Sequence, residues 1–444
     1  MSGTVSPVRR REILDALRRG TVPQRGLDLL AVGLDRIAPA VDAELAAVAD
    51  GGAGFKAIRG EYGSGKTFAV RWLAERARSN GFVTAEVQIS EGETPLHHLE
   101  TVYRRLVESL TTADVAGGAL RAVVDAWFFA LEEEALAGGD LDDAALLAAT
   151  DRLAERRLAD ISRRAPAFTA VLRAYRRAVA DGDRPAADGL LAWLGGQPHV
   201  AASVKRAAGI KGDLDHDGAL GFLAGLLVVL RDAGHPGLLV VLDEVETLQR
   251  VRADARDRAL NAMRQLLDEI DGGRFPGLYL VITGTPAFFD GPQGVSRLPP
   301  LAQRLATDFG TDARFDNPRA AQIRLRGFDL GALRDVGARV RDLYAAGGDA
   351  PDRVRTRCDD AYLALLAERV TGDLGGKAGI APRLFLKKLV GDVLDRIDQF
   401  ADFEPRRDYR LTVQPGELTA VEREAHAAVR PATSVDDIVL DLDD

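Results

Sequence analysis

The octapeptide GEYGSGKT occupies residues 60–67 and decides the fold. It fits the pattern G-x-x-x-x-G-K-[ST] at every fixed position. Glycine is needed because backbone N–H groups can curl around a phosphate only where no Cβ intervenes. A following helix adds the partial positive charge of its N-terminus at the same anion. The octapeptide predicts a phosphate-binding loop formed by Gly60, Glu61, Tyr62, Gly63, Ser64, Gly65, Lys66 and Thr67.

The residues on either side of the octapeptide supply the context that such a loop requires. A short apolar run at 55–58 indicates a strand, and 68–78 have the periodicity of a helix. A glycine-rich turn before an ordinary surface helix is the alternative, and the strand–loop–helix order argues against it. We expect Lys66 to reach the β- and γ-phosphates of ATP and Thr67 to coordinate Mg²⁺.

A second motif, LLVVLDE at 238–244, is an aliphatic strand that ends in two acids. In open parallel sheets, ligands bind outside the carboxyl ends of the strands. Asp243 is therefore predicted to bind Mg²⁺, directly or through water, and Glu244 to orient or polarise the attacking water. A strand end capped by solvated acids is the alternative, which the complete phosphate loop weakens. Glu246 is a lesser candidate for the same crevice.

Three further residues are candidates for completing a hydrolytic site. Thr283 ends an apolar strand and is either a hydrogen-bond partner of the γ-phosphate or water, or an ordinary turn residue. Arg304, in PPLAQRL, fits either an arginine offered to a neighbouring subunit or a surface ion pair. Arg383 follows Pro382 at a helix start, where a cation opposes the helix dipole unless an anion neutralises it. That anomaly favours a phosphate partner for Arg383.

The order of apolar patterns predicts an α/β fold, with a parallel-sheet P-loop core, a large helical insertion and a C-terminal helical lid. Within the insertion we expect one helix at 143–163, another at 187–194, and Trp127-Phe128-Phe129 in the core. A last strand is expected at 322–328. The predicted segments are an N-terminal helical segment on the adenine side (1–50), the core (51–95 and 232–328), the insertion (96–231), the lid (329–400) and a tail (401–444).

Composition limits the class of protein. A chain of 444 residues that is 46% hydrophobic and 28% charged is typical of a folded protein of two or three domains. The one cysteine, Cys358, excludes an intrachain disulfide and suits the cytoplasm. Neither a run of about 20 apolar residues nor an apolar core behind the basic N-terminus is present, so we expect no membrane segment and no signal peptide.

A net charge of −9 excludes a uniformly basic coat for nucleic acid, but it leaves room for a local basic stripe. Such a stripe, or else a solvated face with ion pairs, is expected from arginines of the insertion. These arginines are Arg152, Arg156, Arg157, Arg163 and Arg164.

The motifs occur in an order that resembles the AAA+ class of P-loop ATPases, most nearly its initiator-like and STAND-like branches. The landmarks are GEYGSGKT at 60–67, VVLDE at 240–244, VITGT at 281–285 and APR at 381–383. More discriminating segments resemble the ATP-binding proteins of BREX-type phage-defence systems. They are ALRRGTVPQRGLDLLAVGLDR at 16–36, FKAIRGEYGSGKTF at 55–68, VQIS at 87–90, WLGG at 193–196, KRAAGIKG at 205–212 and VVLDEVETLQ at 240–249.

This resemblance spans most of residues 10–400 and implies an AAA+-like ATPase of bacterial anti-phage defence. It implies a homo-oligomer that works with a helicase or other defence proteins and acts on DNA, directly or through them. It also implies that Val22 and Pro23 contact adenine. The tail 401–444 is short for the winged-helix domain of initiator-like relatives, which puts direct duplex binding in doubt. A nucleotide-gated switch or adaptor with little turnover, and an initiator-like DNA loader, stay open as alternatives.

Overall fold

The computed structural model describes residues 5–137 and 139–429. The chain forms two compact units, which we call the sheet unit and the helical unit. The sheet unit contains residues 39–59 and 76–323, and the helical unit contains residues 1–38, 60–75 and 324–444. Among the described residues, no helix is both long enough and apolar enough to cross a membrane.

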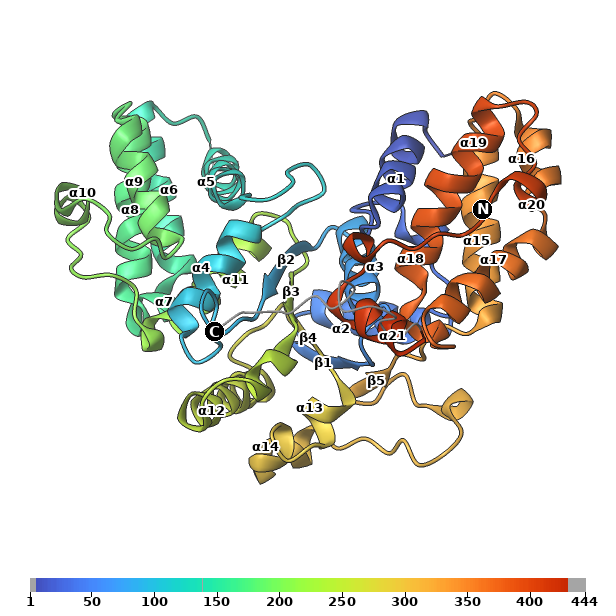
Figure 1. Cartoon of the computed structure of the whole chain (residues 1–444). Helices are drawn as coiled ribbons and strands as arrows, with labels where there is room; N and C mark the ends of the chain where they lie inside the picture. Colours follow the sequence, from blue (N-terminus) through green and yellow to red (C-terminus); the bar gives the residue numbers. More distant parts are fainter. Residues whose placement is uncertain (1–4, 138, 430–444) are drawn as a thin grey trace. The chain divides into compact units, whose positions relative to one another are not determined.

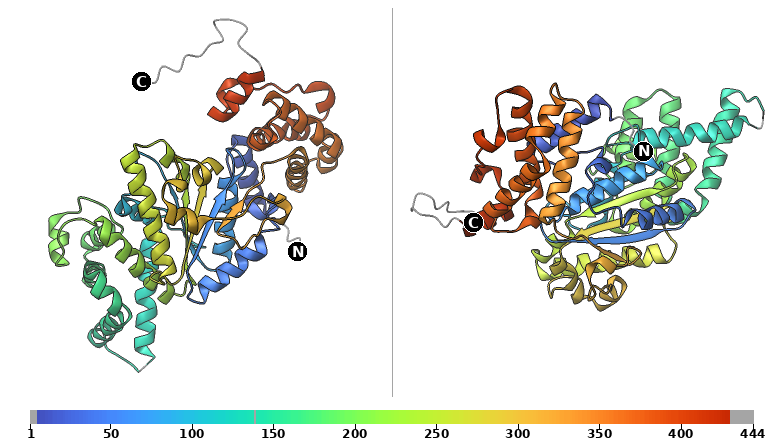
Figure 2. Two further views of the ribbon diagram at one scale, coloured as in Figure 1. Left: turned by 90° about the horizontal axis from the view of Figure 1, so that it is seen from below. Right: turned by 90° about the vertical axis from the view of Figure 1, so that its right-hand side faces the viewer.

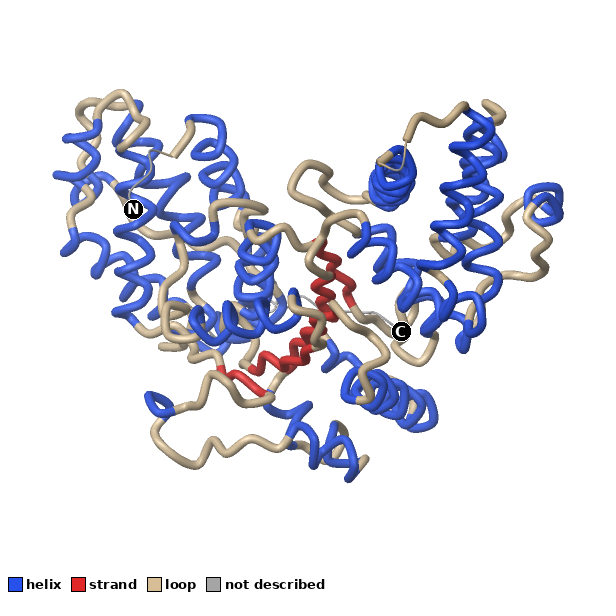
Figure 3. The backbone as a smooth tube through the Cα atoms, turned by 180° about the vertical axis from the view of Figure 1, so that it is seen from behind, coloured by secondary structure: helices blue, strands red, loops and turns tan. Residues whose placement is uncertain are grey.

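A five-stranded parallel sheet with the order β2-β3-β4-β1-β5 forms the centre of the sheet unit (Figures 1 and 3). Its middle strands β3 and β4 are buried along their whole length, as continuous aliphatic runs predict for strands covered on both faces. The predicted α/β class with a parallel-sheet core is therefore confirmed. The strands are β1 (Gly54–Arg59), β2 (Val83–Gln88), β3 (Leu238–Asp243), β4 (Leu278–Gly284) and β5 (Gln322–Arg324).

The strand register brings the carboxyl ends of the central strands to one edge of the sheet. Ile58 of β1 pairs with Thr283 of β4, and Gln88 of β2 pairs with Asp243 of β3. Leu242 and Ile282 connect the two halves of the sheet in the same register. The side chains that end these strands therefore share one edge, as parallel strands require.

The chain between β2 and β3 is helical and lies beside the β2 edge of the sheet (Figures 1 and 2). Its apolar side chains join those of the sheet in one continuous hydrophobic core. The insertion is therefore packed into the sheet unit. Its helices are α4 (Leu99–Ser109), α5 (Leu120–Leu136), α6 (Asp143–Arg157), α7 (Ala159–Arg164), α8 (Pro166–Ala180), α9 (Arg184–Leu194), α10 (Ala202–Ala207) and α11 (His216–Asp232).

Three expectations for the insertion were wrong in detail. The helix expected at 143–163 breaks at Leu158, whose backbone leaves helical geometry while its side chain is buried. Helix α9 begins three residues early, because Asp183 caps it by accepting a hydrogen bond from the N–H of Ala186. Phe129 is 60% exposed, since the buried side of α5 includes its neighbour Phe128 and adjacent helix positions face different directions.

The strand expected at 322–328 is also shorter than predicted. Strand β5 ends at Arg324, and the next residue, Leu325, packs beside Gly60 of the phosphate loop: a Cβ built on Gly60 would lie 3.4 Å from Cβ of Leu325. The alternating pattern of the sequence therefore continues beyond the strand, where Leu325 is partly buried beside the loop.

The helical unit has a core of its own, formed by helices from both ends of the chain. Arg18 and Asp395 join the two ends with hydrogen bonds of 2.7 and 2.9 Å. The tail, for which the sequence predicted no element, contains two short helices in its described part. Besides most of α3 (Lys66–Ser79), the longer helical elements of this unit and the short ones near its C-terminal end are α1 (Pro7–Arg19), α15 (Leu330–Ala345), α16 (Pro351–Arg357), α17 (Asp360–Asp373), α18 (Pro382–Lys387), a π-helical segment (Lys388–Leu394), α19 (Asp395–Gln399), α20 (Pro405–Asp408) and α21 (Ala420–Val429).

Cys358 should report on unfolding of the helical unit. Its side chain is fully buried, and burial raises the pKa of the thiol to about 12. Because the thiolate is the reacting form, we expect a thiol reagent at pH 8 to label the native protein only as fast as the unit opens, and to label the urea-unfolded protein at once. Rapid stoichiometric labelling of the native protein, relative to a Cys358→Ala blank, would contradict this.

Candidate nucleotide-binding site

The phosphate loop follows β1 directly. Strand β1 ends at Arg59, Gly60 opens the loop, and helix α3 (Lys66–Ser79) begins at the motif lysine. Gly63 and Gly65 have φ angles of 79° and 88°, a region in which an L side chain is strained. The predicted order of strand, loop and helix is therefore present, and two of the motif glycines are required by backbone geometry.

Arg59 anchors the strand end from which the loop starts. Its guanidinium is buried and pairs with Asp290. It also lies 5.7 Å from the ring centre of Phe289 and 4.8 Å from that of Phe309, distances typical of cation–π contacts. The sequence offered no local signal for this anchor, since its partners come from segments more than 200 positions away.

Lys66 turns back over its own loop. Its ammonium donates hydrogen bonds to the carbonyl oxygens of Gly60, at 2.9 Å, and Glu61, at 3.4 Å. The ring centre of the exposed Tyr62 lies 5.1 Å from the same ammonium. A phosphate oxygen is negatively charged and would compete with these neutral carbonyls for the ammonium. The lysine is thus placed where a phosphate can replace the carbonyls.

Ser64 supplies a second indication of a polar ligand at the loop. Its hydroxyl oxygen is buried and has no hydrogen-bond partner in the described part of the chain. Buried polar groups are almost always paired, so an unpaired one needs an explanation such as a ligand or a water molecule. A Cβ built on Gly60 would lie 2.2 Å from this oxygen, which explains why position 60 must be glycine.

Residues from the C-terminal part of the chain border the phosphate loop within the helical unit. A Cβ built on Gly63 would lie 2.8 Å from Cα of Ile380 and 3.1 Å from the carbonyl oxygen of Gly379. A Cβ on Gly65 would lie 3.8 Å from the ring of Phe328. Position 63 is therefore restricted to glycine by its neighbours as well as by its own backbone.

The segment that contains Val22 and Pro23 is tied to helix α3. The carboxylate of Glu75, on α3, accepts hydrogen bonds from the N–H groups of Gly26, at 2.6 Å, and Leu27, at 2.7 Å. Pro23 is buried and Val22 is partly buried. The structure thus attaches this segment to the helix that follows the phosphate loop, and contact with adenine stays a prediction. Glu75 was not foreseen, because it looks like any helical acid in the sequence.

Asp243, Glu244 and Thr283 form one hydrogen-bonded cluster at the sheet edge. Asp243 is 5% exposed and accepts hydrogen bonds from the hydroxyl of Thr283 and from the N–H of Glu244, the latter at 3.1 Å. The same N–H lies 3.0 Å from the hydroxyl oxygen of Thr283. The structure therefore brings together three predicted site residues from two strands.

Thr283 orients the aspartate in this structure. It lies inside β4, is fully buried, and donates its single O–H to Asp243. A hydroxyl has one proton to donate, so this proton is committed to the aspartate. The interpretation as an ordinary turn residue does not describe this environment, and contact with phosphate or water stays a prediction.

Glu244 has a strained backbone. Its φ of 59° and ψ of 40° are in the left-handed region, which costs a non-glycine residue about 1–2 kcal/mol. Its carboxylate accepts a hydrogen bond of 3.0 Å from the side-chain amide of Gln88, the last residue of β2. Backbone strain of this kind is concentrated at functional sites. Gln88 was missed by the sequence reasoning, although its position at the end of a neighbouring strand was a usable signal.

Both candidate arginines are held by acids of their own chain. Arg304, on α14 (Pro299–Leu305), pairs with Asp268 and Asp271 of α12 (Ala253–Asp271), each at 2.5 Å. Arg383 pairs with Glu422, with 3.0 Å between Nε and Oε1. Arg304 thus makes the surface ion pair that was its alternative, and the anion beside Arg383 in this structure is a carboxylate. Contacts with a second subunit or a nucleotide stay predictions.

The arginines of the insertion are partly neutralised. Arg157 pairs with Glu134 at 2.8 Å and lies 3.7 Å from Asp232. Arg163 pairs with Asp160 one turn earlier on α7. Ion pairs of this kind are typical of a solvated helix face. The remaining members of the expected stripe, Arg152, Arg156 and Arg164, are exposed.

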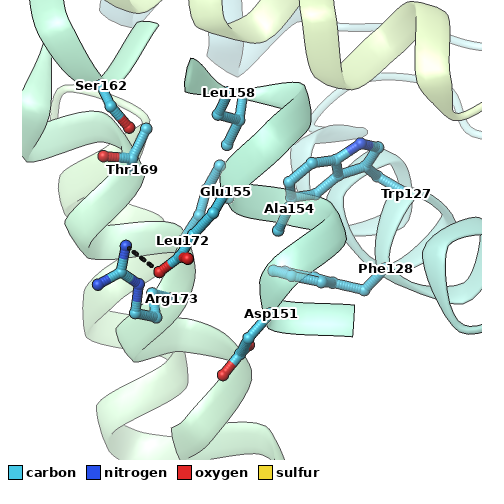
Figure 4. Close-up of a pocket in the computed structure, with 10 residues that line it drawn as sticks. All are labelled: Trp127, Phe128, Asp151, Ala154, Glu155, Leu158, Ser162, Thr169, Leu172 and Arg173. Carbon is cyan, nitrogen blue, oxygen red and sulfur yellow. Dashed lines mark ion pairs between the residues drawn. The ribbon is translucent and has the colours of Figure 1, made fainter. Parts of the chain in front are cut away.

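A separate small cavity lies among helices α5, α6 and α8 of the insertion (Figure 4). Its volume is about 20 Å³, which is room for roughly one water molecule. The ion pair between Arg173 and Glu155, with 3.1 Å between the charged atoms, lies at its wall. The cavity is far too small for a nucleotide, so it is not a second nucleotide site.

A parallel sheet whose strand β1 runs into a glycine-rich phosphate loop, and whose strand β3 ends in a buried aspartate, defines a P-loop nucleotide-binding protein. The family model for the BREX system ATP-binding protein BrxC/D matches residues 5–413. The chain belongs to this family and is an ATP-binding protein of BREX phage defence, a system with further protein components. No curated protein and no solved structure matches the chain.

Glycine at position 244 should be tolerated better than alanine. Glu244→Gly and Glu244→Ala both remove the carboxylate, but only alanine keeps a Cβ in the left-handed region. We expect the glycine variant to be more stable by about 1 kcal/mol in urea unfolding. The same pair of changes at Glu133, exposed on helix α5, should give the opposite order. A less stable glycine variant at 244 would show that the backbone is not strained there.

Proposed function

We propose that the protein hydrolyses ATP with Mg²⁺, and that turnover drives a DNA-acting complex of the BREX system. The observation that carries the proposal is the buried cluster of Asp243, Thr283 and the strained Glu244. It lies at the sheet edge from which β1 continues into the phosphate loop, since Ile58 of β1 pairs with Thr283. Membership of the family supports ATP binding, and the cluster supports the proposal that ATP is hydrolysed.

The phosphate loop is the proposed cradle for the β- and γ-phosphates. The N–H groups of residues 60–67 and the ammonium of Lys66 would donate hydrogen bonds to phosphate oxygens, which would replace the carbonyl oxygens that the lysine contacts in this structure. The unpaired hydroxyl of Ser64 would gain a partner from the same ligand or its water.

Thr67 and Asp243 are the proposed protein ligands of Mg²⁺. This ion prefers oxygen donors, and it usually takes one or two from a protein and the rest from phosphates and water. A hydroxyl at the start of α3 and a buried carboxylate ending β3 match that donor set. When bound, the ion neutralises charge on the phosphates. Thr283 would keep Asp243 in the orientation that this requires.

Glu244 is the proposed group that orients and polarises the attacking water. Its carboxylate is half-buried at the sheet edge and is held on one oxygen by Gln88. A carboxylate fixed in this way has its other oxygen available to a water molecule. Arg304, from a neighbouring subunit of a homo-oligomer, or Arg383, from the lid, would add positive charge at the γ-phosphate.

A nucleotide-gated switch with little turnover is the second candidate. It would recruit a helicase or another component of the defence system when ATP is bound. The observation that favours it is that both candidate arginines are already paired within the chain. A DNA loader is less well supported, because two arginines of the expected basic stripe are neutralised by acids.

Removal of the Lys66 ammonium should weaken nucleotide binding without unfolding the protein. We expect Lys66→Ala to weaken ATP binding by about 10- to 100-fold in calorimetric titration, the range for a buried charge-assisted contact. Lys211→Ala, at an exposed position of the insertion, is the matched control and should bind as wild type. If Lys66→Ala bound ATP as tightly as wild type, the loop would not be the nucleotide site.

Loss of the Glu244 carboxylate should separate binding from hydrolysis. We expect Glu244→Gln to keep ATP affinity and to lose about 100-fold or more in the rate of phosphate release, since a general base contributes about that much. Glu246→Gln tests the lesser candidate and should keep the rate. Undiminished release by Glu244→Gln would remove Glu244 from the mechanism. ATP binding without phosphate release by wild type, even with DNA and partner proteins present, would favour the switch.

A further inference from the structure

Arg383 follows a segment of the helical unit that packs against the phosphate loop. It is the second residue of α18, three positions after Ile380, whose backbone packs against Gly63. Its Nη1 atom lies 3.0 Å from the position of a Cβ built on Gly20, the residue that ends α1 and leads to Val22. The arginine therefore lies beside the segment that leads to Val22, and it follows by three residues the segment that packs on the phosphate loop.

The guanidinium of Arg383 is occupied by the C-terminal helix α21 and the turn before it. Its Nε donates to one carboxylate oxygen of Glu422 at 3.0 Å, and its Nη2 donates to the other oxygen and to the carbonyl oxygen of Glu417. The side chain of Glu422 is 4% exposed, and that of Arg383 is 29% exposed. This bidentate pair has the same geometry as the pair that arginine forms with a phosphate.

The turn that carries this carboxylate is held by further contacts. Glu417 pairs with Lys388 at 2.8 Å and with Lys387 at 3.2 Å. The N–H of Thr419 donates to Glu422 at 2.7 Å, so the carboxylate is fixed from its own side as well. We call residues 417–422 the anionic strap. Its two carboxylates pair with the basic residues Arg383 and Lys387 of α18 and with Lys388, which follows α18.

We propose that Glu422 sets the affinity for a nucleoside triphosphate by competing with the γ-phosphate for Arg383. The proposal rests on the proposed function, in which Arg383 adds charge at that phosphate. One guanidinium cannot offer the same two N–H groups to a buried carboxylate and to a phosphate at once. A γ-phosphate that is bound in the same bidentate geometry, through Nε and Nη2, therefore requires release of the strap, whereas a diphosphate, which lacks the γ-group, leaves it in place.

This competition makes the strap a determinant of specificity rather than a simple brace. Only the triphosphate must break the carboxylate–guanidinium pair when it binds. The free energy of that pair therefore weakens triphosphate binding and leaves diphosphate binding unchanged. The strap therefore reduces the preference for ATP over ADP in the resting protein. A brace without this role would affect both nucleotides equally, through stability.

The test compares Glu422→Gln with Glu424→Gln, which makes the same charge change on the same helix at an exposed position. We expect Glu422→Gln to bind a non-hydrolysable ATP analogue about tenfold more tightly, the order of one charge-assisted hydrogen bond, and to bind ADP as wild type does. Glu424→Gln should bind both nucleotides as wild type. Adding Arg383→Gln to Glu422→Gln should remove the gain.

The outcomes separate this proposal from the proposed function. If Lys66→Ala binds the analogue about 10- to 100-fold more weakly than wild type, and Glu422→Gln binds it no more tightly than wild type, the competition is wrong and the nucleotide site stands. If Lys66→Ala binds as wild type, the proposed site itself fails. Should Glu422→Gln not fold, hydrogen exchange of residues 414–428 in wild type decides. The competition requires that the ATP analogue make these residues exchange faster than in the protein without nucleotide, and that ADP leave their exchange unchanged. Equal or slower exchange with the analogue would overturn it.

Discussion

The alignment of three parallel strands is the constraint on which the rest of the molecule depends. Strands β1, β3 and β4 are held in register by buried aliphatic side chains on both faces of the sheet. Because successive side chains of a strand point to opposite faces, a slip of one residue between β3 and β4 would separate Asp243 from the hydroxyl of Thr283. The packing that fixes the register thus also fixes the acidic cluster and the strand end from which the phosphate loop begins.

Features with a local signal were predictable from the sequence. The octapeptide at 60–67 and the strand LLVVLDE at 238–244 each carry their chemistry within a few residues, and the structure forms the strand, loop and helix that they imply. The break at Leu158 was not predictable, because the apolar spacing of the sequence continues through this residue while its backbone leaves helical geometry. The exposure of Phe129 follows from which side of α5 faces the core, and an almost entirely apolar stretch does not reveal that side.

Contacts between distant positions limited the prediction of the site. Gln88 and Glu244 are neighbours only because β2 and β3 pair across the whole insertion. The acids that hold Arg304 come from helix α12, and no local pattern places that helix beside Arg304. For Arg383, the reasoning from the helix dipole correctly required an anion, but the chain itself supplies one in Glu422. The sequence therefore identified the candidate residues, but it did not predict which residues they contact in this structure.

These resting partners follow from the cost of leaving charge unsatisfied. A half-buried ammonium, guanidinium or carboxylate without a partner is destabilised by several kcal/mol, so a ligand-free P-loop protein needs substitutes for the ligand. The carbonyls on Lys66 and the amide on Glu244 are substitutes of this kind. An ion pair in the ligand-free chain therefore does not argue against a role with nucleotide. The deciding quantity is the free energy needed to replace the acid of that pair by a phosphate. The pair of Arg304 is about one-third exposed and, like most surface pairs, is worth only about 0–1 kcal/mol. The carboxylate on Arg383 is almost completely buried, so its exchange for phosphate carries a cost that Arg304 does not impose.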